Sequence, residues 1–190
     1  MKTLVVASEN KGKLKEIREI LGDRYEIISM RDAGFSGEIL EDGATFYENA
    51  LKKAKTVAET LKTDALADDS GLCVEALGGA PGVYSARYSG SHGDDKANRS
   101  ALLKNLANEK NRRAKFVCNM VLYGANGEIV SGVGETYGNI GYEEEGGNGF
   151  GYDCVFISDD LKKCFGLASD EEKNAVSHRK RAIEDLLCKL

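Results

Sequence analysis

Two adjacent carboxylates, Asp68 and Asp69, end a short apolar run in the stretch ALADDSGL and are followed at once by Ser70. Neighbouring acids repel each other, so they usually need a cation, a metal ion or a shared proton close by. An ordinary surface loop has no need of such a pair at the end of an apolar run. The pattern therefore predicts a site that handles charge, centred on these aspartates.

Lysines that could bind an anion occur in two places before the acids. The loop Ser8-Glu9-Asn10-Lys11-Gly12-Lys13 opens a predicted helix, and a helix N-terminus offers free N–H groups to an anion. An ordinary helix cap with a solvated lysine explains this loop equally well. Lys53 falls in the apolar face of its own predicted helix. A lysine there is rare unless it binds an anion or pairs with an acid such as Glu41 or Asp69.

Acids and lysines together indicate phosphate chemistry with Mg²⁺ as the cofactor. Mg²⁺ is typically held by one or two carboxylates and by substrate phosphates, and it keeps several waters. Asp68, Asp69 and Glu41 are candidates for its ligands or for a general base. Zinc is not expected, because only His92 and His178 are available and no cysteine pair has ligand spacing.

Two later motifs could recognise a base. In Phe150-Gly151-Tyr152-Asp153 an aromatic ring could stack on a base and an acid could bond its edge, although loop aromatics more often pack on their own domain. Ser177-His178-Arg179 lies in the last helical stretch. If one helix runs on from residue 171, Arg179 lies near its apolar stripe. If Ser177 caps a new helix, His178 and Arg179 project from its first turn. A guanidinium facing inward could donate to the carbonyl of a 6-oxopurine.

The elements that must position these residues alternate between strands and helices. Strands are expected at 2–7, 25–29, 116–123, 128–137 and 155–157, with two short apolar runs at 65–67 and 72–74 as the central strands. Helices are expected at 10–22, 45–61, 94–106 and 170–190, the last in one or two pieces. Residues 132–151 contain eight glycines and are expected to be loop. Asn126-Gly127 indicates a hairpin. We therefore predict a mixed, partly antiparallel α/β sheet flanked by helices.

Composition narrows the class of protein. The 190 residues suit a single domain, 1–190, and a net charge of −5 argues against a general nucleic-acid binder. No apolar run approaches the ~20 residues that cross a bilayer, and the N-terminal apolar stretch is too short for a secretory signal. The five scattered cysteines fit free thiols. We expect a cytoplasmic protein that binds neither nucleic acid nor membrane.

The stretch from Ser70 to Tyr88, SGLCVEALGGAPGVYSARY, resembles the signature of the inosine triphosphate pyrophosphatase family, SGL-x-V-x-AL-x-G-x-PGVYSARY after two aspartates. The family's other motifs stand in the same order, as Ser8, Asn10, Lys13 and Glu16; Glu41 before Thr45–Ala50; Phe150–Asp153; and Lys173–Ala182. Two residues depart from the pattern. Glu9 stands where many relatives have asparagine or glycine, and Cys154 stands where proline is usual.

The resemblance implies an enzyme that hydrolyses ITP, dITP and XTP to the monophosphate and pyrophosphate, which keeps these nucleotides out of DNA and RNA. It implies a homodimer and a two-lobed fold with a central substrate cleft. By the same resemblance Asp69 is the general base and holds Mg²⁺ with Glu41. The implied substrate-binding residues are Ser8, Glu9, Asn10, Lys11, Gly12, Lys13, Lys53, Asp68, Ser70, Phe150, Gly151, Tyr152, Asp153, Lys173, His178 and Arg179.

Two other functions fit these residues less well. A sensor that binds triphosphates without turnover could dispense with Asp69 and Glu41, so their presence counts against it. A Maf-like nucleotide pyrophosphatase would share the architecture but act on pyrimidine or modified nucleotides, and the SHR and FGYD motifs favour a purine pocket. Buried donors facing a 6-oxo group would reject adenine by roughly 10⁴–10⁵. The sequence does not identify what rejects GTP.

Overall fold

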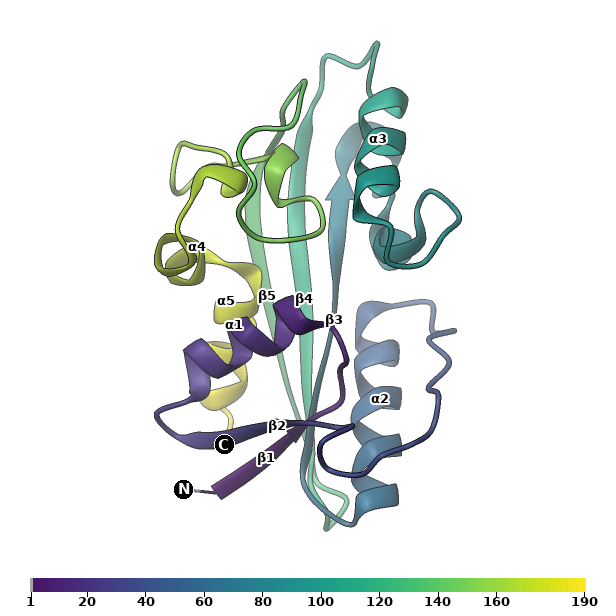
Figure 1. The fold of residues 1–190 in the computed structure, drawn as a ribbon, viewed down its shortest axis with the longest axis vertical. Helices are drawn as coiled ribbons and strands as arrows, with labels where there is room; N and C mark the ends of the chain where they lie inside the picture. The colour runs from purple at the N-terminus through teal and green to yellow at the C-terminus, as the bar shows by residue number, and fades with distance from the viewer. Residues whose placement is uncertain (1) are drawn as a thin grey trace. The chain divides into compact units, whose positions relative to one another are not determined.

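The computed structural model describes residues 2–190 (Figure 1). The strands are β1 (Lys2–Val6), β2 (Tyr25–Ser29), β3 (Ala65–Val74), β4 (Arg113–Tyr123), β5 (Ile129–Ile140) and β6 (Phe156–Ser158). The helices are α1 (Lys11–Leu21), α2 (Phe46–Leu61), α3 (Asp95–Asn105), α4 (Asp170–Val176) and α5 (His178–Leu187). No helix among these residues is long and apolar enough to cross a membrane.

The six strands form one sheet in the order β2-β1-β3-β4-β5-β6. β1 pairs in parallel with β2 and β3, whereas β5 and β6 are antiparallel. Helices flank the sheet, so the predicted mixed α/β fold is confirmed. The central substrate cleft stays a prediction.

The chain forms two compact units, each assembled from segments far apart in sequence. Unit 1 contains the residues up to Asp69 together with 118–134 and 179–190, and unit 2 contains 70–117 and 135–178. Strands β3, β4 and β5 each contribute residues to both units. Neither unit is therefore a continuous stretch of chain.

Unit 1 has a core on each face of its strands. Figure 1 shows α1 and α5 on one face and α2 on the other. Ile17, Ile183 and Leu66 of β3 belong to the first core, and Val57 and Ala67 belong to the second. Leu66 and Ala67 are neighbours, and successive side chains of a strand point to opposite faces. The alternation along β3 thus serves both cores at once.

Unit 2 has its own core, built around three phenylalanines. The rings of Phe116 and Phe156 lie 4.6 Å apart between centroids, and those of Phe156 and Phe165 lie 5.2 Å apart. Leu72 of β3 and Leu102 of α3 are fully buried in the same cluster. Tilted ring pairs at these distances are favourable beyond the area they bury.

Strand β3 continues through the acids, where the sequence suggested two short apolar runs with a break. Asp68 and Asp69 lie in the middle of this ten-residue strand and are both buried. Their carboxylates are tolerated because cationic and amide side chains meet them on both faces, which local sequence cannot show. The two runs are one strand.

The expectation that residues 132–151 are loop is wrong for their first part, because β5 extends to Ile140. Its glycines permit close packing. A Cβ at Gly132 would lie 2.2 Å from the carbonyl oxygen of Ala182 in α5, and one at Gly138 would lie 2.2 Å from that of Ile157 in β6. Here glycine marks contact between backbones and not a turn.

The C-terminal stretch is two helices, so the second of the two expected arrangements is correct. Ser169 and Glu172 form a capping box at the start of α4, and the helix ends at Ser177, whose backbone is extended at φ −69°, ψ 151°. His178 and Arg179 are consequently the first residues of α5. They belong to unit 2 and unit 1 respectively.

Candidate active site

Asp68 and Asp69 face opposite sides of β3 because they are neighbours in a strand. Asp68 meets Lys13 of α1 and Arg179 of α5, whereas Asp69 meets side chains of α2. The pleat therefore gives two adjacent acids separate surroundings. This relieves the repulsion that the sequence pattern implied.

Asp68 is wholly buried and held by two cations. Its Oδ2 lies 3.1 Å from Nζ of Lys13 and accepts a hydrogen bond of 3.0 Å from Nη2 of Arg179. Burial alone would raise the pKa of Asp68, but Lys13 and then Arg179 outweigh it and hold that pKa well below its usual range. Burial likewise disfavours the charge of Lys13, yet Asp68 raises the pKa of this lysine. The pair is ionised.

Asp69 has a different balance of forces. Nδ2 of Asn49 donates to its Oδ2 at 3.0 Å, and Nζ of Lys53 lies 3.9 Å from its Oδ1. Burial raises the pKa of Asp69, and the opposing effect of Lys53 does not cancel that rise. A carboxylate whose pKa is raised accepts a proton more readily than an ordinary one. Of the two neighbouring acids, Asp69 is the one suited to act as a base.

Lys53 links Asp69 to Glu41. The ammonium of this buried lysine donates to Oε2 of Glu41 at 3.1 Å. The ion pair that the sequence offered as the alternative reading of Lys53 is therefore present, and it gathers the two acids around one cation. Unit 1 thus brings together five predicted residues, which are Lys13, Glu41, Lys53, Asp68 and Asp69.

The N-terminus of α2 fixes the segment that carries Glu41. Thr45 caps the helix by accepting the N–H of Glu48 at 3.2 Å. Asn49, one turn further on, accepts the N–H of Gly43 at 2.8 Å while it donates to Asp69. One amide side chain therefore ties the loop before α2 to Asp69 of β3.

Glu41 and Asp69 are the two carboxylates near Lys53 that could hold Mg²⁺. Both carboxylates approach the same ammonium, so their oxygens converge on one region of unit 1. Magnesium usually takes one or two carboxylates and completes its shell with water and phosphate oxygens. Residues 2–190 contain no group of three or more His, Cys, Asp or Glu arranged to hold a metal, and a two-carboxylate site does not require one.

The loop before α1 is built as a helix cap. Oδ1 of Asn10 accepts the N–H of Lys13 at 3.1 Å, and the N–H of Asn10 donates to Oγ of Ser8 at 3.2 Å. Lys13 turns inward to Asp68, but Glu9 and Lys11 are exposed, and Glu9 bonds Arg31. Of this loop, the structure brings Lys13 to the acids and leaves Glu9 and Lys11 at the surface.

Unit 2 brings a second group of predicted residues together. Asp153 is buried and accepts hydrogen bonds from Nζ of Lys173 at 2.5 Å and from the N–H of Phe150 at 2.9 Å. The ammonium of Lys173 also lies 4.7 Å from the centre of the Phe150 ring. A buried ion pair beside a partly exposed ring can offer both charge and a flat apolar surface to a ligand. Ser70 also belongs to unit 2, as the next residue of β3.

His178 and Arg179 are neighbours with different surroundings. The ring of His178 stacks on Phe116 in unit 2, with centroids 4.8 Å apart and planes 14° apart. Arg179 is fully buried in unit 1, where it bonds both Glu16 and Asp68. Its bonds to two carboxylates favour a role in holding Asp68. Donation by Arg179 to a base stays a prediction.

Sequence reasoning left Asn49 and Glu16 without a role. Each is a buried polar side chain in a helix, and each contacts a site residue: Asn49 contacts Asp69, and Glu16 contacts Arg179. Helical spacing could have found Asn49, because it lies four residues before Lys53 on the same inward stripe. Glu16 required the position of α5, which only the fold supplies.

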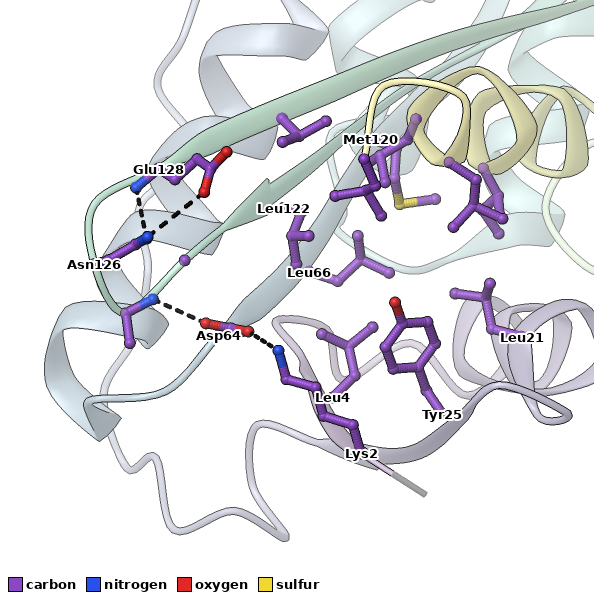
Figure 2. A pocket seen from close by; sticks show the side chains of 17 residues that line it. Lys2, Leu4, Leu21, Tyr25, Asp64, Leu66, Met120, Leu122, Asn126 and Glu128 are labelled. Carbon is purple, nitrogen blue, oxygen red and sulfur yellow. Dashed lines mark hydrogen bonds and ion pairs between the residues drawn. The ribbon is translucent and has the colours of Figure 1, made fainter.

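An apolar pocket of about 510 Å³ lies elsewhere in unit 1 (Figure 2). Leu4, Leu66 and Met120 form part of its wall, and Lys2 pairs with Asp64 at its rim. Among residues 2–190, those lining it include none of the predicted site residues. Its apolar wall offers little to a triphosphate, so the charged cluster at Asp68 and Asp69 is the better active-site candidate.

Known proteins resemble the chain over nearly its full length. A model of the Ham1 family matches residues 4–189. The dITP/XTP pyrophosphatase of Clostridium tetani is 44% identical over 194 residues, covering 100% of this chain and 96% of that protein. The dITP/XTP pyrophosphatase of Haemophilus influenzae is 44% identical over 192 residues, covering 98% of each.

Solved structures also resemble the chain over nearly its full length. The Ham1 protein of Staphylococcus aureus matches with a TM-score of 0.88 at 40% identity, covering 99% of this chain and 97% of that one. A nucleoside-triphosphatase, named as a dITP/XTP pyrophosphatase, from Mycobacterium abscessus matches with a TM-score of 0.78 at 42% identity, covering 98% and 99%. The resemblance seen in the sequence is confirmed, and the chain belongs to the Ham1 family.

Proposed function

We propose that this protein hydrolyses non-canonical purine nucleoside triphosphates, dITP, XTP and ITP, to the monophosphate and pyrophosphate. Support comes from its family and from relatives named dITP/XTP pyrophosphatase over the whole chain. The observation that carries the proposal is the setting of Asp69, a buried acid with a raised pKa beside the Lys53–Glu41 pair. In this arrangement Asp69 can accept a proton from water, and Lys53 can bind phosphate next to it.

In the proposed reaction Asp69 accepts a proton from a water molecule. At the same time the oxygen of that water attacks one of the two phosphorus atoms joined by the α–β bridging oxygen. The bond between that phosphorus and the α–β bridging oxygen breaks, and the monophosphate and pyrophosphate leave. Asn49 holds Asp69 in place through a bond of 3.0 Å. Lys13 and Lys53 offset the negative charge of the triphosphate, and Asp68 keeps Lys13 charged. Preorganised charges of this kind stabilise a transition state without reorganisation.

Glu41 and Asp69 would hold Mg²⁺. The bound ion would supply positive charge to the phosphate oxygens, as is usual in phosphoryl transfer. Lys53 sits between the same two acids, so in the absence of the ion it keeps their charges compensated.

We assign recognition of the purine base to residues of unit 2. Phe150 would stack on the purine, and Asp153, Lys173 and His178 would bond its edge. The ion pair of Lys173 and Asp153 supplies one donor and one acceptor side by side. A 6-oxopurine presents an acceptor where adenine presents a donor. If the site donates a hydrogen bond at that position, its donor has no acceptor when adenine is bound. This favours hypoxanthine and xanthine over adenine.

Two further proposals concern the protein as a whole. We propose that it is a homodimer, which size-exclusion chromatography with light scattering would test, a monomer at all concentrations contradicting it. We also propose that it works in the cytoplasm. Fractionation of cells, followed by immunoblotting, would test that location.

The experiment that tests the activity is the release of pyrophosphate from dITP, XTP, ITP, GTP and ATP, with Mg²⁺ and with EDTA. We expect release from the first three that stops in EDTA, with ATP and GTP nearly inert. Phosphate in place of pyrophosphate would place the attack on the terminal phosphorus. Tight binding of dITP without any release would mean that the protein is a sensor.

A further inference from the structure

Two side chains of α3 bind the backbone N–H and C=O of one residue, Gly151, in the Phe150–Asp153 loop. Oδ2 of Asp95 accepts the N–H of Gly151 at 2.8 Å, and Nη1 of Arg99 donates to the carbonyl oxygen of Gly151 at 2.9 Å. Asp95 and Arg99 are four residues apart, so they lie on one face of the helix. Both polar groups of a single glycine are thus bound by one helix.

Gly151 has the backbone conformation that most needs such support. Its φ is +59°, in the left-handed region that glycine adopts readily and other residues rarely do. The same freedom lets an unsupported glycine adopt many other conformations. Asp95 and Arg99 therefore select one conformation at the most adaptable residue of the loop.

Asp95 and Arg99 together form a clamp on Gly151, and the contacts around this clamp fix the loop on its other sides. Nε of Arg99 donates to Glu144 at 3.0 Å, which orients the guanidinium toward Gly151. The hydroxyl of Tyr152 donates to the carbonyl oxygen of Ser85 at 2.6 Å, and Asp153 accepts the N–H of Phe150 at 2.9 Å. With Gly151 held, Phe150 keeps its place beside Lys173.

We propose that Asp95 and Arg99 are positioning residues that preorganise the Phe150–Asp153 loop for the purine base. They set the affinity for the base and the choice among bases, and they leave the hydrolytic step unchanged. The inference rests on the proposed role of this loop in binding the base. A loop ordered before binding costs no ordering when the ligand arrives, and that saving appears as affinity.

The test compares Arg99→Met, which keeps the apolar stem but removes the donor, with the wild-type enzyme. We expect the KM for dITP to rise about tenfold or more while kcat stays within about threefold, because the loop binds the base equally in the bound substrate and in the transition state. The preference for ITP over ATP should fall with it. Arg99→Lys should recover part of the affinity, since an ammonium can still donate to Gly151. Lys104→Met, an exposed position on the same helix, is the matched control and should change nothing.

Inorganic triphosphate separates positioning of the base from general damage, because it carries no base. Its inhibition constant should be the same for Arg99→Met and wild type. Equal weakening of dITP and inorganic triphosphate would overturn the proposal, as would an unchanged KM. Asp95→Ala removes the other contact and should repeat the pattern. If both variants fail to fold, the two residues are structural and the proposal is wrong.

Phe150→Ala distinguishes failure of the clamp from failure of the loop assignment. If Phe150→Ala raises the KM for dITP and Arg99→Met does not, the loop binds the base without the clamp, which is then refuted. If neither variant alters the KM while the wild-type enzyme hydrolyses dITP, the base is bound elsewhere. The proposed clamp and the proposed role of the loop are then both wrong, but the proposed enzymatic activity is not affected.

Discussion

At the scale of single residues, the pleat of β3 divides work between two acids that are adjacent in sequence. Asp69 faces α2 and has a raised pKa, whereas Asp68 faces α1 and α5 and stays ionised between cations. We infer that the first does chemistry and that the second holds Lys13 and Arg179. Matched substitutions to asparagine separate these two roles.

Asp69→Asn should lower kcat for dITP by a factor of about 10²–10⁴, the usual contribution of a general base. The amide keeps the size of the side chain, so nucleotide binding and thermal stability should change little. Pyrophosphate release and equilibrium binding of dITP would be measured side by side. Near-normal turnover in this variant would remove Asp69 from the role of base.

Asp68→Asn should instead destabilise the protein by about 3–5 kcal/mol, because it leaves Arg179 and Lys13 buried beside a neutral partner. The folded-state pKa of Asp68 lies below its unfolded value, so the stabilisation is complete above about pH 5 and shrinks as the pH falls. Urea unfolding of wild type and variant should therefore converge in strong acid. A difference in stability that grows in acid would contradict this reading.

How far the sequence predicts the site depends on which neighbours each residue needs. Asp69, Lys53 and Glu41 could be grouped from sequence, because helical spacing alone places Lys53 inward and an inward lysine requires an acid. The bonds of Arg179 to Glu16 and Asp68 could not be foreseen, since they join residues more than a hundred positions apart. Pairing across such distances is decided by tertiary packing, which local patterns do not contain.

At the scale of the elements, the glycines of β5 allow other backbone segments to pack closely against the strand. Gly132→Ala would bring a Cβ to 2.2 Å from the carbonyl oxygen of Ala182 and 2.5 Å from the backbone nitrogen of Leu186. Both atoms belong to the backbone of α5, so the helix must move. We expect a loss of about 1–3 kcal/mol of stability, typical of overpacking, measured by urea unfolding.

Gly147→Ala is the matched control for that substitution, because a Cβ there meets no atom within 4 Å. An exposed change of this kind should alter stability by no more than about 0.5 kcal/mol. Equal effects of the two variants would mean that close packing of β5 on α5 does not explain Gly132. The glycine count of residues 132–151 predicts loop at both positions, although the expected strand 128–137 includes Gly132, because glycine count does not distinguish a turn from a close contact.

Other elements were predictable because their signals are local. The cap at Asn10, the capping residues Thr45 and Glu48, and the Asn126-Gly127 turn each act within a few residues, and the corresponding helices and hairpin are present. The course of β3 through its acids was not predictable, because two charges in mid-strand are acceptable only when other elements neutralise them. Local signals therefore identify most of the elements, and long-range contacts decide their extent.

At the scale of the whole molecule, the cores of the two units share strand β3. Leu66 and Leu72 lie on β3 but belong to unit 1 and unit 2 respectively. Leu72→Ala should cost about 2–5 kcal/mol, as large-to-small core changes do. We expect hydrogen exchange to show reduced protection in α1 as well as α3, because loss of β3 affects both cores. Reduced protection confined to unit 2 would show that the units unfold independently.

The scattered make-up of unit 1 bears on how the protein is made. Its core requires Ile183 and Leu186, which follow every segment of unit 2 in the chain, together with Leu4 and Val6, which precede them. Every segment of unit 2 is synthesised before residue 179. Domains usually fold from the N-terminus onward during translation. We therefore expect the order to be reversed in this chain: the core of unit 1 is completed only when α5 is synthesised, after every segment of unit 2.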